Sequence, residues 1–254
     1  MSIPYNSYIP RVAIVTGGAQ GIGHAIVQRL ADDGIDVAVN DIASKHDLID
    51  KVVEEVRQKG RRAIAVPADV SSEADVSEMV KKTASELGSV DIMIANAGIF
   101  PFSPLIETST EKFDKVLAVN ARGVFLCFKL AALQMIKQGR GGRLLAASSL
   151  AGVQGNRSLT DYSASKFAVR GIVHCSAIEL GEYGITANAY APGAIATPEN
   201  AGIHDEIRDK VGSLGSAPLG NAEDLAAVIS FLARPDSWFV NGQTINANGA
   251  FYCT

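Results

Sequence analysis

Short apolar runs alternate with longer amphipathic stretches along most of the chain. Apolar residues in the longer stretches recur every three or four positions, as Ile22, Ile26 and Leu30 do, which is the period of a helix with one buried face. The predicted helices are 21–33, 47–59, 72–87, 109–138, 161–183 and 222–233. The predicted strands are 11–17, 36–41, 62–69, 90–98, 142–149, 185–193 and 242–249. Strand–helix alternation predicts an α/β fold with a parallel sheet, and near-continuous apolar strands indicate that both sheet faces are covered.

No linker, repeat or low-complexity block divides the 254 residues. We therefore predict a single domain over 1–254, with an N-terminal tail at 1–9. The Gly/Ala-rich segment 194–220 has weak periodicity, and we expect a mobile loop there that can include a short helix.

Composition excludes several classes of protein. The formal net charge of -4 comes without the basic stripe that nucleic-acid binding requires. We expect no membrane segment, because no apolar run of spanning length is evident and the polar N-terminus does not resemble a signal peptide. Cys127, Cys175 and Cys253 show neither CxxC nor metal-ligand spacing, and neither do the four histidines. These features predict a cytoplasmic protein without disulfides or a metal site.

The stretch "VAIVTGGAQGIGHAI" places glycines between the first strand and the first helix. Gly17, Gly21 and Gly23 follow the pattern G-x-x-x-G-x-G, with Gln20 and Ile22 inside it. Such a turn lets backbone N–H groups approach a pyrophosphate at the positive end of the helix dipole. We interpret it as a nucleotide-binding turn, the alternative being a turn with only a structural role.

Asp41 ends the second predicted strand, eighteen residues beyond Gly23. A carboxylate there accepts hydrogen bonds from the adenosine ribose 2′-OH and repels a 2′-phosphate. Gln20 and Asn40 are neutral, so the sequence favours NAD(H) over NADP(H). Lys45 lies close enough in sequence to leave NADP(H) open.

Tyr162 and Lys166 lie four residues apart in a predicted helix and therefore share one helix face. A nearby ammonium stabilises a phenolate and lowers its pKa, which would let Tyr162 act as a general acid or base. Ser149 ends a predicted strand, where a ligand crevice is expected. Asn120 interrupts an apolar helical pattern and calls for a hydrogen-bonding role. Each residue alone is also compatible with a surface, capping or core role.

Taken together, these motifs resemble the short-chain dehydrogenases/reductases. The resemblance covers roughly residues 10–250 and implies a Rossmann-type, doubly wound fold, a nicotinamide dinucleotide and a homodimer or homotetramer. The segments that carry it are "TGGAQGIG", "ADV" at 68–70, "NAG" at 96–98, Asn120, Ser149, "YSASK" and "PGAIATP" at 192–198.

The resemblance also implies a role for each matching residue. Tyr162 would be the acid/base, Lys166 would lower its pKa and bind the nicotinamide ribose, and Ser149 would polarise the substrate oxygen. Asn120 would hold a water in a proton relay to Lys166. The further cofactor contacts it implies are Asp69 and Val70 at the adenine, Asn96, Ala97 and Gly98 along the crevice, and Pro192, Gly193, Ile195 and Thr197 at the nicotinamide.

Three positions depart from the family's usual pattern. Ala95 stands where an Asn is frequent, and we expect this to alter packing rather than chemistry. Asn248 and Ala250 stand where Asp and Gly are usual, close to subunit contacts in many members, so the tetramer contact is expected to differ in detail.

The substrate is less constrained by the sequence. "GNRSLTDYSASKFAVRG" and "GITANAYAPG" are similar to the diacetyl/acetoin reductases, whereas "TPENAGI" differs from their usual TPMW. Ile99, Phe100 and Phe102 are equally compatible with a pocket for bulkier cyclic, aromatic or terpenoid alcohols. A non-catalytic NAD(H)-binding protein and a dehydratase or epimerase on the same scaffold are the alternatives of another class.

Overall fold

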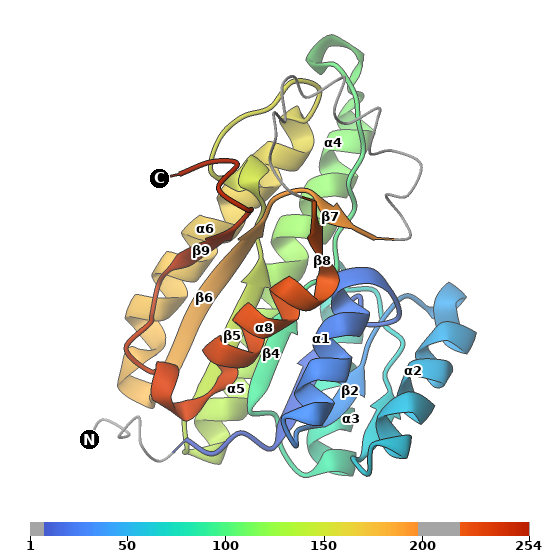
Figure 1. The fold of residues 1–254 in the computed structure, drawn as a ribbon, viewed down its shortest axis with the longest axis vertical. Helices are drawn as coiled ribbons and strands as arrows, with labels where there is room; N and C mark the ends of the chain where they lie inside the picture. The colour runs from blue at the N-terminus through green and yellow to red at the C-terminus, as the bar shows by residue number, and fades with distance from the viewer. Residues whose placement is uncertain (1–7, 198–218, 254) are drawn as a thin grey trace.

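Seven parallel strands form one sheet in the computed structural model, which describes residues 8–197 and 219–253. Their order is β3-β2-β1-β4-β5-β6-β9, so the order reverses between β1 and β4 (Figure 1). The predicted α/β fold with its doubly wound parallel sheet is confirmed. The strands are β1 (Val12–Val15), β2 (Asp36–Val39), β3 (Ala63–Ala65), β4 (Ile92–Ala95), β5 (Gly142–Ala147), β6 (Ile185–Pro192) and β9 (Thr244–Ala247).

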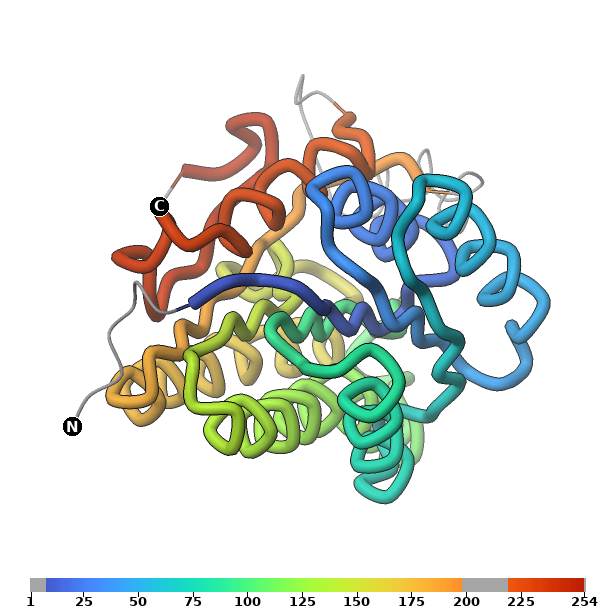
Figure 2. The backbone as a smooth tube through the Cα atoms, turned by 90° about the horizontal axis from the view of Figure 1, so that it is seen from below, coloured from blue at the N-terminus to red at the C-terminus, as the bar shows by residue number. Residues whose placement is uncertain are grey.

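Helices cover both faces of this sheet (Figure 2). One layer holds α1 (Gly21–Asp32), α2 (His46–Gln58) and α8 (Ala222–Ala233), and the other holds α3 (Glu73–Leu87), α5 (Gly123–Gln138) and α6 (Thr160–Leu180). Successive strand residues point to opposite layers: Ala13 and Val15 pack with the first, and Val12 and Ile14 with the second. Both faces are therefore core, which explains why the strands are apolar without alternation.

Local signals in the sequence set several helix boundaries. The Ser72 side chain caps α3 by accepting a hydrogen bond from the Asp75 N–H, and Gly88 ends this helix in the left-handed conformation at φ 96°. Gly139 ends α5 in the same way at φ 68°. Asn221 begins α8 in a capping box. Glycine is favoured at such C-caps because it has no Cβ to oppose a positive φ.

The predicted helix 109–138 is continuous but not uniform. It consists of α4 (Thr110–Leu117), a π-helical turn (Ala118–Arg122) and α5. The whole helix, Thr110–Gln138, is long and apolar enough to cross a membrane, so the expectation that no segment reaches that length is wrong. Half of its most apolar window is buried inside the molecule, where the helix packs on α3 and α6. Its buried face is apolar like that of a core helix of a globular protein, while Phe125 and Leu133 on α5 are exposed.

A small second sheet lies at the edge of the predicted loop 194–220. β7 (Ile195–Ala196) pairs in parallel with β8 (Gly220–Asn221), and the Gly220 N–H donates to the Ala194 carbonyl at 3.0 Å. The two ends of this segment are thus joined directly before α8. Residues 198–218 lie outside the described residues, as do 1–7 of the predicted tail.

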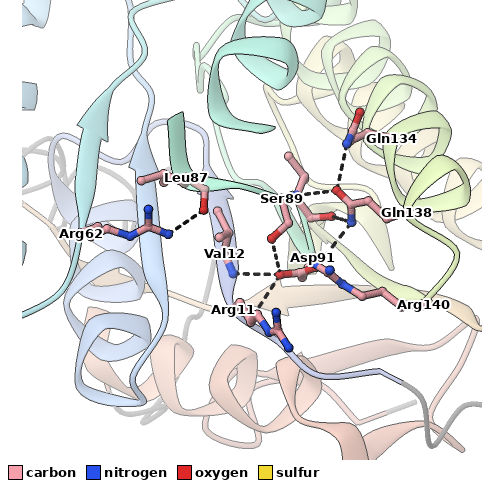
Figure 3. A network of polar contacts seen from close by, with 10 residues as sticks. Arg11, Val12, Arg62, Leu87, Ser89, Asp91, Gln134, Gln138 and Arg140 are labelled. Atoms are coloured by element: carbon pink, nitrogen blue, oxygen red, sulfur yellow. Dashed lines mark hydrogen bonds and ion pairs between the residues drawn. The ribbon is translucent and has the colours of Figure 1, made fainter. Parts of the chain in front are cut away.

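Asp91 joins three strands at the amino edge of the main sheet (Figure 3). Its Oδ2 accepts hydrogen bonds from the backbone N–H groups of Arg11 and Val12 at 3.1 and 3.0 Å and from the Ser89 hydroxyl at 2.8 Å. Its Oδ1 accepts from Arg140 Nη2 at 2.7 Å. Because Asp91 is only 1% exposed, these bonds replace most of its hydration.

We expect Asp91→Ala to lower the free energy of unfolding by about 3 kcal/mol, because it leaves buried N–H donors and the Arg140 charge without their acceptor. Denaturant unfolding measures this loss. Asp236→Ala is the matched control, since Asp236 pairs with Arg234 where both side chains are more than half exposed, and it should cost at most about 0.5 kcal/mol. Equal losses in the two variants would contradict the role given to Asp91.

Candidate functional site

Two adjoining cavities open at the carboxyl edge of the main sheet. The larger, about 630 Å³, lies over the ends of β1 to β4, and the smaller, about 240 Å³, lies over the ends of β4 to β6. Ligands of doubly wound sheets bind outside the carboxyl ends, where the strand order reverses. The residues that line both cavities are Ile22, Asn96, Gly98, Ile99 and Phe100.

The glycine turn between β1 and α1 forms one wall of the larger cavity. Gly17 and Gly21 have φ angles of +63° and +55°, which favour glycine. A Cβ on Gly23 would overlap the Gly17 carbonyl oxygen and lie 2.8 Å from Asn96 Nδ2. The Gln20 side chain does not cap α1, and N–H groups at a helix N-terminus favour an anion. This cradle, which a Cβ would fill, fits the pyrophosphate of a dinucleotide.

Asp41 lies two residues beyond the end of β2, on the wall of the same cavity. Its carboxylate accepts hydrogen bonds from the N–H groups of Ile42 at 2.9 Å and Ala19 at 3.4 Å. Lys45 Nζ lies 3.5 Å from Asp41 Oδ1. The carboxylate is therefore fixed by the backbone, and Lys45 offsets part of its charge.

Tyr162, Lys166 and Ser149 meet at the smaller cavity. Lys166 lies one turn after Tyr162 on α6, and its ammonium donates to the Ala147 carbonyl at 2.9 Å while lying 5.4 Å from the centre of the Tyr162 ring. Ser149 follows β5 and lines the same cavity as Tyr162, whose pKa it acts to lower. Ser149 Oγ also accepts from the Ala151 N–H at 3.1 Å, which fixes its rotamer.

Asn120 is fully buried in the π-helical turn, behind these residues. Its amide pairs with the backbone of Ile99, accepting from N–H at 2.8 Å and donating to the carbonyl at 2.9 Å. It also donates to Ser165 Oγ at 3.1 Å, and Ser165 in turn donates to the Tyr162 carbonyl at 2.7 Å. Asn120 thus joins the loop after β4 to α6, and such π-helical turns occur frequently at functional sites. Its water relay stays a prediction.

The pKa values of Tyr162 and Lys166 are both shifted so as to favour the neutral forms of these groups. Desolvation raises the pKa of Tyr162 to about 12, while the hydrogen bond with Ser149 acts in the opposite direction. Desolvation lowers the pKa of Lys166 from 10.5 to about 8. Burial thus dominates the Tyr162 pKa with the groups of this chain alone, and the lowering of that pKa by Lys166 stays a prediction.

The structure brings nearly all of the predicted cofactor contacts to the two cavities. Those at the larger cavity are Gly17, Gln20, Ile22, Gly23, Asp41, Asp69, Val70, Asn96, Ala97, Gly98 and Thr197. Those at the smaller cavity are Tyr162, Lys166, Pro192, Gly193 and Ile195. Gly21 begins α1 beside them.

Three residues of the site were not predicted. Thr16 Oγ1 accepts hydrogen bonds from the N–H groups of Asn96 and Ala97, both at 3.0 Å, and a polar residue after an apolar strand was its only signal. Tyr190 lines the smaller cavity and donates to Asn96 Oδ1 at 2.9 Å. Lys115 lines the larger cavity from α4, and nothing in its sequence context sets it apart.

The positions that depart from the resemblance have local explanations. Ala95 is buried in β4, in register with Ala146 of β5. Asn248 Nδ2 donates to the Tyr252 carbonyl at 2.9 Å. Ala250 adopts φ 63°, a conformation that costs a residue with a Cβ about 1 kcal/mol and explains the usual glycine.

Comparison with known proteins finds one family throughout. Residues 11–208 match the family model described as short chain dehydrogenase. A short-chain dehydrogenase/reductase, eriH, of Hericium erinaceus is 49% identical, over 94% of this chain and 96% of the relative. A 3-oxoacyl-[acyl-carrier-protein] reductase, FabG, of Staphylococcus epidermidis is 38% identical, over 94% and 98%. The solved structure of acetoin dehydrogenase YohF from Salmonella typhimurium matches with a TM-score of 0.86 and 31% identity, over 96% of each chain.

We expect Lys166→Met to stabilise the protein at pH 7 by about 1–2 kcal/mol while abolishing turnover. Below pH 8 the ammonium is charged in both states, so its burial opposes folding in full. Between the folded pKa of about 8 and the unfolded value of 10.5, the unfolded state binds more protons, and wild-type stability rises with pH.

Unfolding at pH 7 and pH 9.5 measures this effect, and the advantage of the variant should shrink at the higher pH. Above pH 10 the raised pKa of Tyr162 acts with the opposite sign, since the unfolded state ionises first. Lys129→Met is the control, because Lys129 is exposed and pairs with Glu73. If Lys166→Met and wild type differ in their free energy of unfolding by the same amount at both pH values, the buried-charge account is contradicted.

Proposed function

The chain belongs to the short-chain dehydrogenase family of oxidoreductases, which act on alcohols and ketones with a nicotinamide cofactor, and on that premise we propose that it interconverts a small secondary alcohol and its ketone with NAD(H). One observation carries the proposal. Ser149, Tyr162 and Lys166 line one cavity of about 240 Å³, with Lys166 one helical turn from Tyr162 and its ammonium held by the Ala147 carbonyl.

The chemistry follows from what these side chains can donate and accept. A carbonyl oxygen that takes its place between Ser149 Oγ and Tyr162 Oη receives two hydrogen bonds. Lys166, Pro192, Gly193 and Ile195 line the cavity where a nicotinamide would be held, and that group would supply the hydride when bound. As negative charge grows on the oxygen, Tyr162 Oη gives up its proton to it. Lys166 Nζ stabilises the resulting phenolate, and alcohol oxidation reverses each step.

The cofactor preference rests on Asp41. Its carboxylate is held by two backbone N–H groups at the wall of the larger cavity, where it can accept from a ribose 2′-OH and would repel a 2′-phosphate. Lys45 is held at 3.5 Å by the same carboxylate, which reduces its attraction for a phosphate. These contacts favour NAD(H).

Cavity size favours a small substrate such as diacetyl or acetoin. About 240 Å³ is below the range of about 300–1,000 Å³ that drug-sized ligands occupy. Asn156 also lines the cavity, and among the described residues its amide makes one long bond, 3.5 Å to the Gln154 carbonyl, so it can donate to a second substrate oxygen. The structural likeness to an acetoin dehydrogenase supports the same substrate class.

An aromatic wall favours a second candidate, a bulkier cyclic or aromatic ketone. The ring of Phe100 meets those of Tyr162 and Phe102 edge to face, with centroid distances of 4.6 and 4.8 Å. Phe100 is 37% exposed, so part of this surface is open to a ligand. Aromatic side chains bind flat apolar ligands well.

We also propose a homo-oligomer in a reducing, cytoplasmic compartment. The exposed apolar side chains of Phe125 and Leu133 on α5 and Ile178 on α6 form a surface that a second copy would cover. Cys127, Cys175 and Cys253 are free thiols, which suits a reducing environment.

Initial rates of NADH oxidation with diacetyl, acetoin, an aromatic ketone and a bulky cyclic ketone test the proposal. Fast turnover of the small ketones alone supports it, and preference for a bulky ketone supports the second candidate. Tyr162→Phe should lower kcat by at least about 10³-fold with NADH binding retained, because it removes only the proton donor. Full activity in this variant, or no oxidation of NADH or NADPH with any ketone, would overturn the mechanism.

We expect Asp41→Ala to raise the KM for NADH about tenfold and to improve the use of NADPH, since it removes both the 2′-OH acceptor and the repulsion of a 2′-phosphate. Steady-state kinetics with both cofactors measure the change. Asp47→Ala, a change in the first turn of α2 outside the cavity lining, is the control. A wild-type enzyme that uses both cofactors equally would refute the preference.

A further inference from the structure

A line of hydrogen bonds crosses the carboxyl edge of the sheet from β6 to the glycine turn. Tyr190, on β6, is fully buried, and its hydroxyl lies 2.9 Å from Asn96 Oδ1. In register with Tyr190 on β5 lies Ala147, whose small side chain lets the phenol reach past β5 to the residue after β4. Asn96 Nδ2 lies 3.0 Å from the Thr16 carbonyl and 3.3 Å from the Gly17 carbonyl.

The direction of each bond in this line is fixed by chemistry. The carbonyls of Thr16 and Gly17 can only accept, so the Asn96 amide must present its NH₂ group to them and its oxygen to Tyr190. The Tyr190 hydroxyl must therefore donate. Burial raises the pKa of Tyr190, and the nearby Tyr162 raises it further, so this proton is retained wherever the protein is folded.

The glycine turn packs directly on the Asn96 amide. A Cβ on Gly17 would lie 3.1 Å from Asn96 Nδ2, and a Cβ on Gly23 would lie 2.8 Å from the same atom. The two glycines thus leave room for this one amide group. Any rotation of the Asn96 side chain would break its bonds to the turn and press against it.

We propose that Tyr190 is a positioning residue that holds the glycine turn in its dinucleotide-binding conformation through Asn96. Without the hydroxyl, Asn96 Oδ1 has lost its donor, and the amide can rotate to find another. The turn then samples conformations in which its N–H groups no longer converge. The inference rests on the proposed function only for the identity of the ligand, a nicotinamide dinucleotide.

Two measurements on Tyr190→Phe test this role, and the first needs no cofactor. Hydrogen exchange of the amides of residues 16–24 should become faster than in wild type, because the turn has lost its support. The Kd for NADH, from fluorescence titration, should rise about tenfold. In kinetics the KM for NADH should rise by a larger factor than kcat at saturating NADH falls.

Tyr8→Phe is the matched control. Tyr8 is also buried, and its hydroxyl donates to the Ala233 carbonyl at 3.0 Å, at the opposite edge of the sheet. Tyr8→Phe should lower thermal stability about as much as Tyr190→Phe does, but it should change neither the hydrogen exchange of residues 16–24 nor the Kd for NADH.

A double-mutant cycle identifies the route. Asn96→Ala alone should loosen the turn and weaken NADH binding, and adding Tyr190→Phe should then have little further effect. Equal effects of Tyr190→Phe in both backgrounds would overturn the inference, as would wild-type exchange of residues 16–24 in Tyr190→Phe. The turn could loosen as expected in Tyr190→Phe while the wild-type chain binds neither NADH nor NADPH. That result would support the positioning role and overturn the proposed function.

Discussion

The hydrogen bond from the Lys166 ammonium to the Ala147 carbonyl, 2.9 Å long, holds α6 against the carboxyl end of β5. Because Ala147 is the last residue of that strand, the bond fixes the height of α6 relative to the sheet. Tyr162, one turn earlier on α6, then comes level with Ser149, two residues past the strand. The neighbouring Ser148 hydroxyl donates to the Lys166 carbonyl at 3.2 Å, so both ends of this lysine are tied to the same strand end.

The same arrangement keeps the Lys166 ammonium away from water, with a carbonyl rather than a carboxylate as its partner among the described residues, and its pKa falls accordingly. Burial raises the pKa of the neighbouring Tyr162 phenol. Near pH 7 such a site holds a protonated phenol beside a buried ammonium, and its response to charge that develops on a ligand is strong because little water screens it. The free energy that this costs in folding is offset by the doubly covered sheet, as is common where stability and activity conflict.

Much of this architecture could be predicted from the sequence. Apolar runs and helical periods gave every strand of the main sheet, because a sheet buried on both faces leaves a strong apolar signal. The glycine turn and the YxxxK spacing located the site, because each motif imposes a geometry that can be recognised from neighbouring residues alone. The π-helical turn at Asn120, the pairing of Tyr190 with Asn96 and the upward pKa shift of Tyr162 could not be predicted, because they depend on which distant side chains meet and on how deeply they are buried. The apolar length of Thr110–Gln138 was also missed, a helix whose most apolar window is half buried in the molecule.

The short parallel ladder between β7 and β8 fixes the two ends of the segment 197–219 beside each other. Loop-closure entropy depends only weakly on length once the ends are held, and β8 leads directly into the capping box of α8. Changes in the length or composition of that segment therefore do not have to propagate into the sheet or the glycine turn. Because the ladder anchors both ends of this segment on the same domain, insertions and substitutions between those ends are compatible with an unchanged core.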